Sequence, residues 1–181
     1  SRVHSANLDP KVLPNAVHLE GDLIGFVFQE PAILGQLSGH VSAEDFFAEG
    51  NRQTWRTFTE MRAAGHSIDP KLAFTWMAKK GRSEAFGGDE RLVAYFIERM
   101  NTAVGKDEAE DYAKAIRATR IARDLIDFGQ KISKAAYAVT HEVDTVLEEA
   151  HRRIGEIGTS ASSAVCRSQW DASAAYFAGL D

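Results

Sequence analysis

The chain has 181 residues, of which 44% are hydrophobic and 26% are charged, with a formal net charge of −5. This hydrophobic content is that of a folded protein and argues against a disordered chain. The mildly acidic balance makes the chain a poor candidate for nucleic-acid binding by bulk electrostatics, so no strong direct nucleic-acid binding is expected.

A compact helical head is predicted for the first half of the chain. Residues 1–14 contain two prolines and are expected to form an irregular lead-in. Residues 15–104 then show about five to six segments with helical periodicity, which predicts an orthogonal helical head. The first of these helices is expected to begin at Asn15, as an N-cap residue, and to end at Gln29.

Local signals divide the rest of the head into further helices. Ser42 to Asp45 is a variant of the capping box, and it is expected to open a turn before the next long helix. Asp69 followed by Pro70 combines an N-cap with proline at the first helical position, which predicts a helix start. The last head helix is predicted from the clear helical period of Leu92, Val93, Phe96, Ile97 and Met100.

Residues 105–158 are predicted to form a long helical hairpin, with its bend at Thr140 and His141. The long helix has one apolar stripe with coiled-coil spacing, made of Ile121, Leu125, Phe128, Ile132, Ala135 and Val139. A second stripe on another face contains Tyr112, Ala115, Ile116, Ala122 and Ile126. The return helix repeats the seam spacing with Val143, Leu147, Ala150, Ile154 and Ile157.

Two interpretations of the hairpin remain open. It is either an ordinary pair of core helices or an assembly element, because one stripe can pack on the head and the other then needs a partner. Charged residues on the long helix suggest a solvated face, with Arg120–Asp124 and Arg123–Asp127 as i,i+4 pairs. Residues 159–181 are expected to be a linker or an appended tail.

No motif for catalysis, cofactor binding or metal binding is found. The sequence contains no G-x-x-x-x-G-K-[ST], H-E-x-x-H or G-x-S-x-G pattern, and no two histidines are spaced for a helical metal site. Cys166 is the single cysteine, so an internal disulfide and a cysteine-based zinc site are excluded and a reducing, cytoplasmic location is favoured. No apolar run approaches the roughly 20 residues that span a bilayer, so no membrane association is expected.

The order of motifs resembles the N-terminal domain of bacterial DnaB-type replicative helicases. The resemblance covers about residues 14–157 and follows the order and approximate spacing of that family. The matching positions are Pro14, Glu20 and Ile24-Gly25; Glu44-Asp45-Phe46-Phe47 with Arg52; Gly65 with Ile68-Asp69; Gly87-Gly88 with Tyr95-Phe96; and Tyr112-Ala113, Ile116-Arg117 and Arg123 with Leu125.

The resemblance implies a non-catalytic collar domain that self-associates as a dimer, or as a hexamer built as a trimer of dimers, and that docks primase or a helicase loader. ATP and Mg²⁺ are then expected only in a motor domain that this chain lacks. Since the chain begins at Ser1, we expect a processed N-terminus or a piece of a longer protein. The residues expected to carry self-association are Ile121, Leu125, Phe128, Ile132, Val139, Val143, Leu147 and Ile154.

Three alternatives remain at this stage. A free-standing regulatory protein that mimics the collar and binds a helicase or primase would be encoded by a gene ending near Asp181. A small all-α enzyme would require a pocket with converging polar groups. A nucleic-acid-binding module would show binding that is sensitive to salt.

Overall fold

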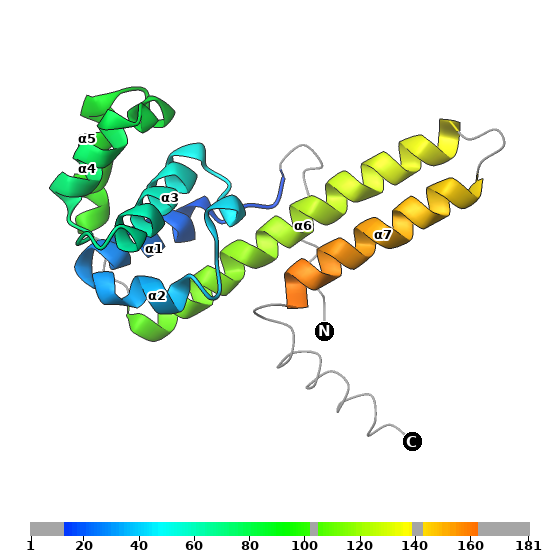
Figure 1. Cartoon of the computed structure of the whole chain (residues 1–181), viewed down its shortest axis with the longest axis horizontal. Helices are drawn as coiled ribbons and strands as arrows, with labels where there is room; N and C mark the ends of the chain where they lie inside the picture. The colour runs from blue at the N-terminus through cyan, green and yellow to red at the C-terminus, as the bar shows by residue number, and fades with distance from the viewer. Residues whose placement is uncertain (1–12, 102–104, 139–142, 163–181) are drawn as a thin grey trace, which may run out of the picture.

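The computed structural model describes residues 13–101, 105–138 and 143–162, and within these ranges it contains helices and turns but no strand. A head formed by the first helices lies at one end, and two antiparallel helices extend from it as an arm (Figure 1). The predicted all-α fold, a helical head followed by a long hairpin, is therefore confirmed. The elements are α1 (Val17–Gln29), η1 (Pro31–Ile33), α2 (Leu34–Leu37), η2 (Ala43–Asp45), α3 (Glu49–Ala63), α4 (Pro70–Lys79), η3 (Arg82–Phe86), α5 (Asp89–Met100), α6 (Lys106–Ala138) and α7 (Val143–Ser162).

Helix α1 is the centre of the head, because it contacts α3, α5 and α6. Leu23, Ile24 and Val27 on this helix are completely buried. Aromatic rings join α1 to α3 and α5. Phe28 of α1 packs edge-to-face with Phe58 of α3 and with Phe96 of α5, at 5.0 Å and 4.9 Å between ring centroids. Such edge-to-face pairs stabilise a core beyond the area that they bury.

Of the two helix starts predicted from N-cap residues, one is confirmed and one is wrong. Asp69 caps α4 as predicted, accepting hydrogen bonds from the backbone N–H groups of Lys71 (2.9 Å) and Leu72 (3.2 Å). The prediction of Asn15 as the N-cap of α1 is wrong, because the helix begins at Val17 and the Asn15 amide donates to the carbonyl of Leu13 instead. A side chain two residues before the helix start can satisfy a neighbouring carbonyl without capping the helix.

Helix α5 buries only part of its apolar face. The helix predicted from the period of its apolar residues is confirmed. Leu92 and Phe96 are buried, whereas Val93, Ile97 and Met100 are exposed. The apolar stripe is wider than the surface that the other head helices cover, and its outer half is left open to solvent.

Helix α6 belongs to both parts of the molecule. Its first third packs on the head through Ala109, Ala113 and Ile116, which are completely buried, and the rest continues away from the head beside α7 (Figure 1). Helix α7 continues to Ser162, past residue 158 where the hairpin was expected to end. The predicted bend and the remainder of the tail lie outside the described residues. None of the described helices is long and apolar enough to cross a membrane.

Candidate assembly surface

The hairpin seam is formed by half-buried side chains of α6 and α7. Phe128 and Ile132 of α6 lie against Val146 of α7, and they line a groove of about 330 Å³ between the two helices. Ala150 and Ile157 of α7 are also half-buried. Two helices alone thus shield their shared seam only partly, and an apolar groove stays open along it.

The sequence prediction selected a different face of α7 for this seam. Among the return-helix stripe, Val143, Leu147 and Ile154 are 58%, 51% and 45% exposed, so the prediction that this stripe packs on α6 is wrong for these three residues. Val146 was missed, although its spacing to Ala150 and Ile157 fits the same period of three and four. Helix α7 is apolar on two faces, and periodicity alone does not say which face is inside.

The eight residues predicted for self-association fall into three groups. Ile121, Phe128 and Ile132 are half-buried, and Val139 lies outside the described residues. The remaining four are exposed: Leu125, Val143, Leu147 and Ile154.

Helix α6 carries a further open face away from α7. Ile126 and the strongly exposed Tyr137 lie on this face with Gly129 and Ser133 between them, and together they line a shallow depression. The predicted second stripe is therefore divided, because Ile116 packs in the head whereas Ile126 remains open. Small residues between larger ones allow another helix to approach closely.

Three arginines of α6 attach the hairpin to η2 and to the segment before α1. Arg123 donates to the carbonyls of Pro14 (2.9 Å) and Asp45 (2.8 Å), and Arg120 donates to the carbonyl of Glu44 at 2.6 Å. Arg117 lies 3.7 Å from the Asp45 carboxylate. The predicted Arg120–Asp124 pair is confirmed at 2.8 Å, but the predicted Arg123–Asp127 pair is wrong, because Arg123 reaches the head instead.

Glu20 of α1 binds the segment between η2 and α3. Its carboxylate is completely buried and accepts hydrogen bonds from the backbone N–H groups of Phe47 (2.6 Å) and Ala48 (3.2 Å) and from the side chain of Asn51 (2.9 Å). Tyr95 donates its hydroxyl to the Asn51 side chain at 2.6 Å, and burial raises the pKa of Tyr95. A carboxylate from α1 thereby satisfies the N-terminus of α3, where Ala48 has no capping side chain of its own.

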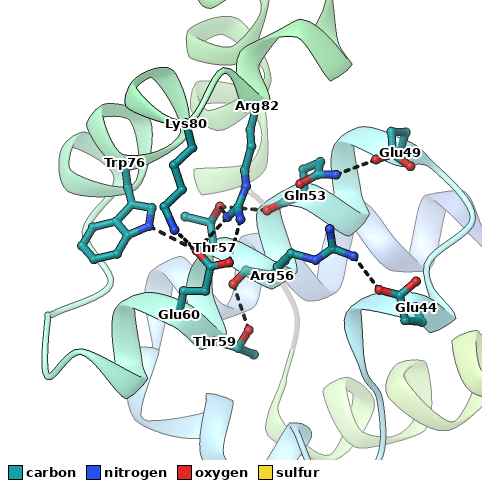
Figure 2. A network of polar contacts seen from close by, with 10 residues as sticks. All are labelled: Glu44, Glu49, Gln53, Arg56, Thr57, Thr59, Glu60, Trp76, Lys80 and Arg82. Carbon is teal, nitrogen blue, oxygen red and sulfur yellow. Dashed lines mark hydrogen bonds and ion pairs between the residues drawn. The ribbon is translucent and has the colours of Figure 1, made fainter.

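A second ionic cluster lies between α3 and α4. Glu60 accepts hydrogen bonds from Lys80 (2.6 Å), Arg82 (2.6 Å) and the indole of Trp76 (3.3 Å), as Figure 2 shows. Hydrogen bonding to Arg82 and then to Lys80 lowers the pKa of Glu60 to about 2, although partial burial opposes the shift. This cluster fixes α4 against α3 and supplies no group poised for proton transfer near neutral pH.

We expect Glu60→Gln to lower the free energy of unfolding by about 1 kcal/mol near neutral pH. The loss is small because the ion pairs of Glu60 with Lys80 and Arg82 are partly solvated and screened. The pKa of Glu60 in the folded chain, about 2, lies below its ordinary value of 4.5. The stability that the ionised carboxylate contributes is therefore complete above the ordinary pKa, and it is lost as the pH falls toward the pKa of the folded chain. Urea denaturation at a series of pH values from neutral downward measures the effect. Glu84→Gln, an exposed carboxylate in η3, is the control, and a Glu60→Gln deficit that grows with acid contradicts the prediction.

Within the part of the chain that the structure describes, no group of His, Cys, Asp and Glu side chains is placed to hold a metal ion. The polar groups around Glu20 and Glu60 form hydrogen bonds that join elements of the head to one another. Most of the exposed large apolar side chains of the described residues lie on the hairpin and along α4 and α5. These features are suited to binding other macromolecules.

Comparison with known proteins agrees with this architecture. The family model described as the DnaB-like helicase N-terminal domain matches residues 12–118, which end within α6. The chain is 25% identical over 147 residues to the replicative DNA helicase DnaB of Geobacillus stearothermophilus, covering 81% of this chain and 32% of that protein. It is 26% identical over 144 residues to DnaB of Pasteurella multocida, covering 79% of this chain and 30% of that protein.

Among solved structures, the N-terminal domain of DnaB helicase from Mycobacterium tuberculosis has the same fold, with a TM-score of 0.69 and 17% sequence identity. The match covers 81% of this chain and 99% of that one. The chain thus spans about a third of the length of the helicases that it matches, and the resemblance noted in the sequence is confirmed for their N-terminal portion.

Proposed function

Because the chain belongs to the family of DnaB-like helicase N-terminal domains, we propose that it is the non-catalytic assembly and docking domain of a replicative DNA helicase. In this role it forms a collar by self-association, as a dimer or as a trimer of dimers. The relatives are replicative DNA helicases by name, and the matched family is that of their N-terminal domain rather than of a motor. ATP hydrolysis and Mg²⁺ binding therefore belong to a part of the helicase that this chain does not match.

The observation that carries self-association is the apolar surface of the hairpin. Leu147 and Ile154 are exposed on α7 beside the seam, and Ile126 is open on α6. A hairpin with exposed apolar residues on both helices is what a symmetric helix-to-helix interface requires, because burial of these side chains needs a second molecule. The open groove at the seam adds a site where side chains of a second hairpin can insert.

Leu147→Glu is expected to weaken self-association at least about a hundredfold, because a leucine burial worth roughly 1.5 kcal/mol is lost twice across a two-fold interface. Sedimentation velocity over a concentration series measures the change in mass, with circular dichroism to show that the variant remains helical. Ile97→Glu is the matched control, since Ile97 is 54% exposed and Leu147 51% exposed but Ile97 lies on the head. A monomeric parent, or equal effects of both substitutions, contradicts the hairpin assignment.

The head is proposed to contribute docking of primase or of a helicase loader. Support for this role is the apolar surface along α4 and α5, which the hairpin does not cover. The alternative, a regulator that imitates the collar and captures a helicase, uses the same surfaces. It predicts that the chain enters hexamers of a full-length helicase and lowers their unwinding rate, which a mixing experiment measures.

A further inference from the structure

A groove runs along α4 on the head, on the side facing the end of α3. Its floor and walls enclose about 400 Å³. We call it the α4 groove, and it is lined by Met61, His66, Leu72, Thr75, Trp76, Lys79 and Lys80. Neither the family match nor the hairpin interface assigns a role to this surface.

The apolar wall of the α4 groove is held in place before any partner arrives. The Trp76 indole donates to Glu60 at 3.3 Å, and its ring meets the edge of the His66 ring with 5.3 Å between centroids. Lys80 lies over the same ring at 5.4 Å, and Figure 2 shows the Trp76, Lys80 and Glu60 side chains converging. A tryptophan that is already ordered loses little entropy on binding, and tryptophans of this kind dominate binding energies at interfaces.

The open part of the groove has helical spacing. Leu72, which is 48% exposed, precedes Trp76 by one turn, and Lys79 follows one turn later. These positions form a continuous ridge along about two turns of α4. A ridge of this length, with an apolar groove beside it, matches the way an amphipathic helix binds, through side chains at i, i+3 or i+4, and i+7.

The charge at one end of the groove is positive, in contrast to the chain as a whole. Lys79 and Lys80 lie at the C-terminal end of α4, and Arg82 follows in η3. Glu60 balances only one of these three cations, although it contacts two of them. Helix α4 itself contains no acidic residue, whereas the chain has a net charge of −5. The groove therefore complements a partner that carries negative charge beside an apolar face.

We propose that the α4 groove binds an amphipathic helix of a partner protein, with its apolar face on Leu72 and Trp76 and its acidic residues at Lys79 and Lys80. This inference rests on the proposed docking function and specifies its site and the chemistry of the partner. A protein segment is favoured over a nucleic acid because the exposed aliphatic side chain of Leu72 lies beside Trp76, and the groove has only two lysines.

Three labelled peptides of equal length test the proposal by fluorescence anisotropy with the intact chain at physiological salt. One has leucines at helical spacing with flanking glutamates, the second replaces the glutamates by lysines, and the third replaces the leucines by serines. The acidic amphipathic peptide is expected to bind, and the other two at least about tenfold more weakly, since both the charge and the apolar contacts contribute.

Variants of the chain locate the site. Lys79→Glu and Leu72→Ser are each expected to weaken binding of the acidic peptide about tenfold. The matched controls are Lys71→Glu, at the other end of the same helix, and Val17→Ser, an exposed apolar residue at the start of α1; both are expected to change the affinity less than about threefold.

The proposal is overturned if the acidic peptide does not bind, if the basic peptide binds equally well, or if Lys71→Glu is as damaging as Lys79→Glu. Competition by a single-stranded oligonucleotide at low micromolar concentration also overturns it, in favour of a nucleic-acid site. Sedimentation of the same variants keeps this result separate from the proposed collar function. Failure of peptide binding with intact self-association rejects the α4 groove alone.

Discussion

Glu20→Ala is expected to lower the free energy of unfolding of the head by about 3 kcal/mol, the range observed when a buried charged partner of several hydrogen bonds is removed. Glu20 is completely buried, so water does not replace the lost acceptor. The N–H groups of Phe47 and Ala48 and the side chain of Asn51 would remain buried donors without their present partner. Urea denaturation followed by circular dichroism measures the loss.

Two comparisons make the Glu20 experiment specific. Glu20→Gln keeps the shape but places an amide NH₂ group against donors, so it is expected to lose about 2 kcal/mol and to rescue little. Glu30→Ala, an exposed carboxylate just after the same helix, is expected to change stability by less than about 0.5 kcal/mol. Hydrogen exchange at the Phe47 amide should accelerate in Glu20→Ala. Full stability in Glu20→Gln would contradict the assignment of the carboxylate as an obligatory acceptor.

Local signals were sufficient for most of the head. The sequence Asp69–Pro70 predicts the start of α4 because both the cap and the fixed proline φ act within one turn. Leu23 and Val27 lie on the buried face of α1, and helical period and hydrophobicity are sufficient to identify that face because together they determine which side of a helix leaves water. Such inferences depend on residues that are close in the chain.

The contacts that join the elements could not be predicted in this way. Arg123 has a plausible local partner in Asp127, yet its bonds go to carbonyls 109 and 78 residues away. The N-terminus of α3 lacks a capping side chain of its own, and its acceptor comes from Glu20 on another helix. A backbone carbonyl or N–H group carries no residue-specific signal, so the sequence offers no pattern for a bond between a side chain and a distant backbone.

The same limit explains the hairpin. The apolar residues of α7 fit two seams, one through Val146 and one through Leu147, and both have the period of a packed helix. Packing on α6 selects the first seam, and the second is left exposed. The sequence therefore predicts that a second apolar face exists, whereas the three-dimensional structure is needed to say which residues form it.

Arg123→Met is expected to destabilise the chain by about 2 kcal/mol, because two charge-assisted bonds to backbone carbonyls are lost while an unbranched apolar stem is retained. These bonds join α6 to the segment before α1 and to Asp45, the last residue of η2. The guanidinium also lies 5.2 Å from the centroid of the Phe47 ring. A planar group with several donors can reach both carbonyls at once, whereas Arg123→Lys is expected to restore about half of the loss, since an ammonium group replaces the fork.

The Arg123 substitution should also change how the arm is held, which distinguishes a connecting role from simple stabilisation. Beyond Ile116, the contacts of α6 with the head are mainly those of Arg117, Arg120 and Arg123. Spin labels at Glu90 in the head and at the highly exposed Tyr137 on α6, in a Cys166→Ser background, report the distance between the two parts. Dilution with unlabelled chain removes distances between molecules. The distribution should broaden in Arg123→Met and narrow again in Arg123→Lys. A Met variant that loses stability with an unchanged distribution would show that Arg123 is not needed to orient the hairpin.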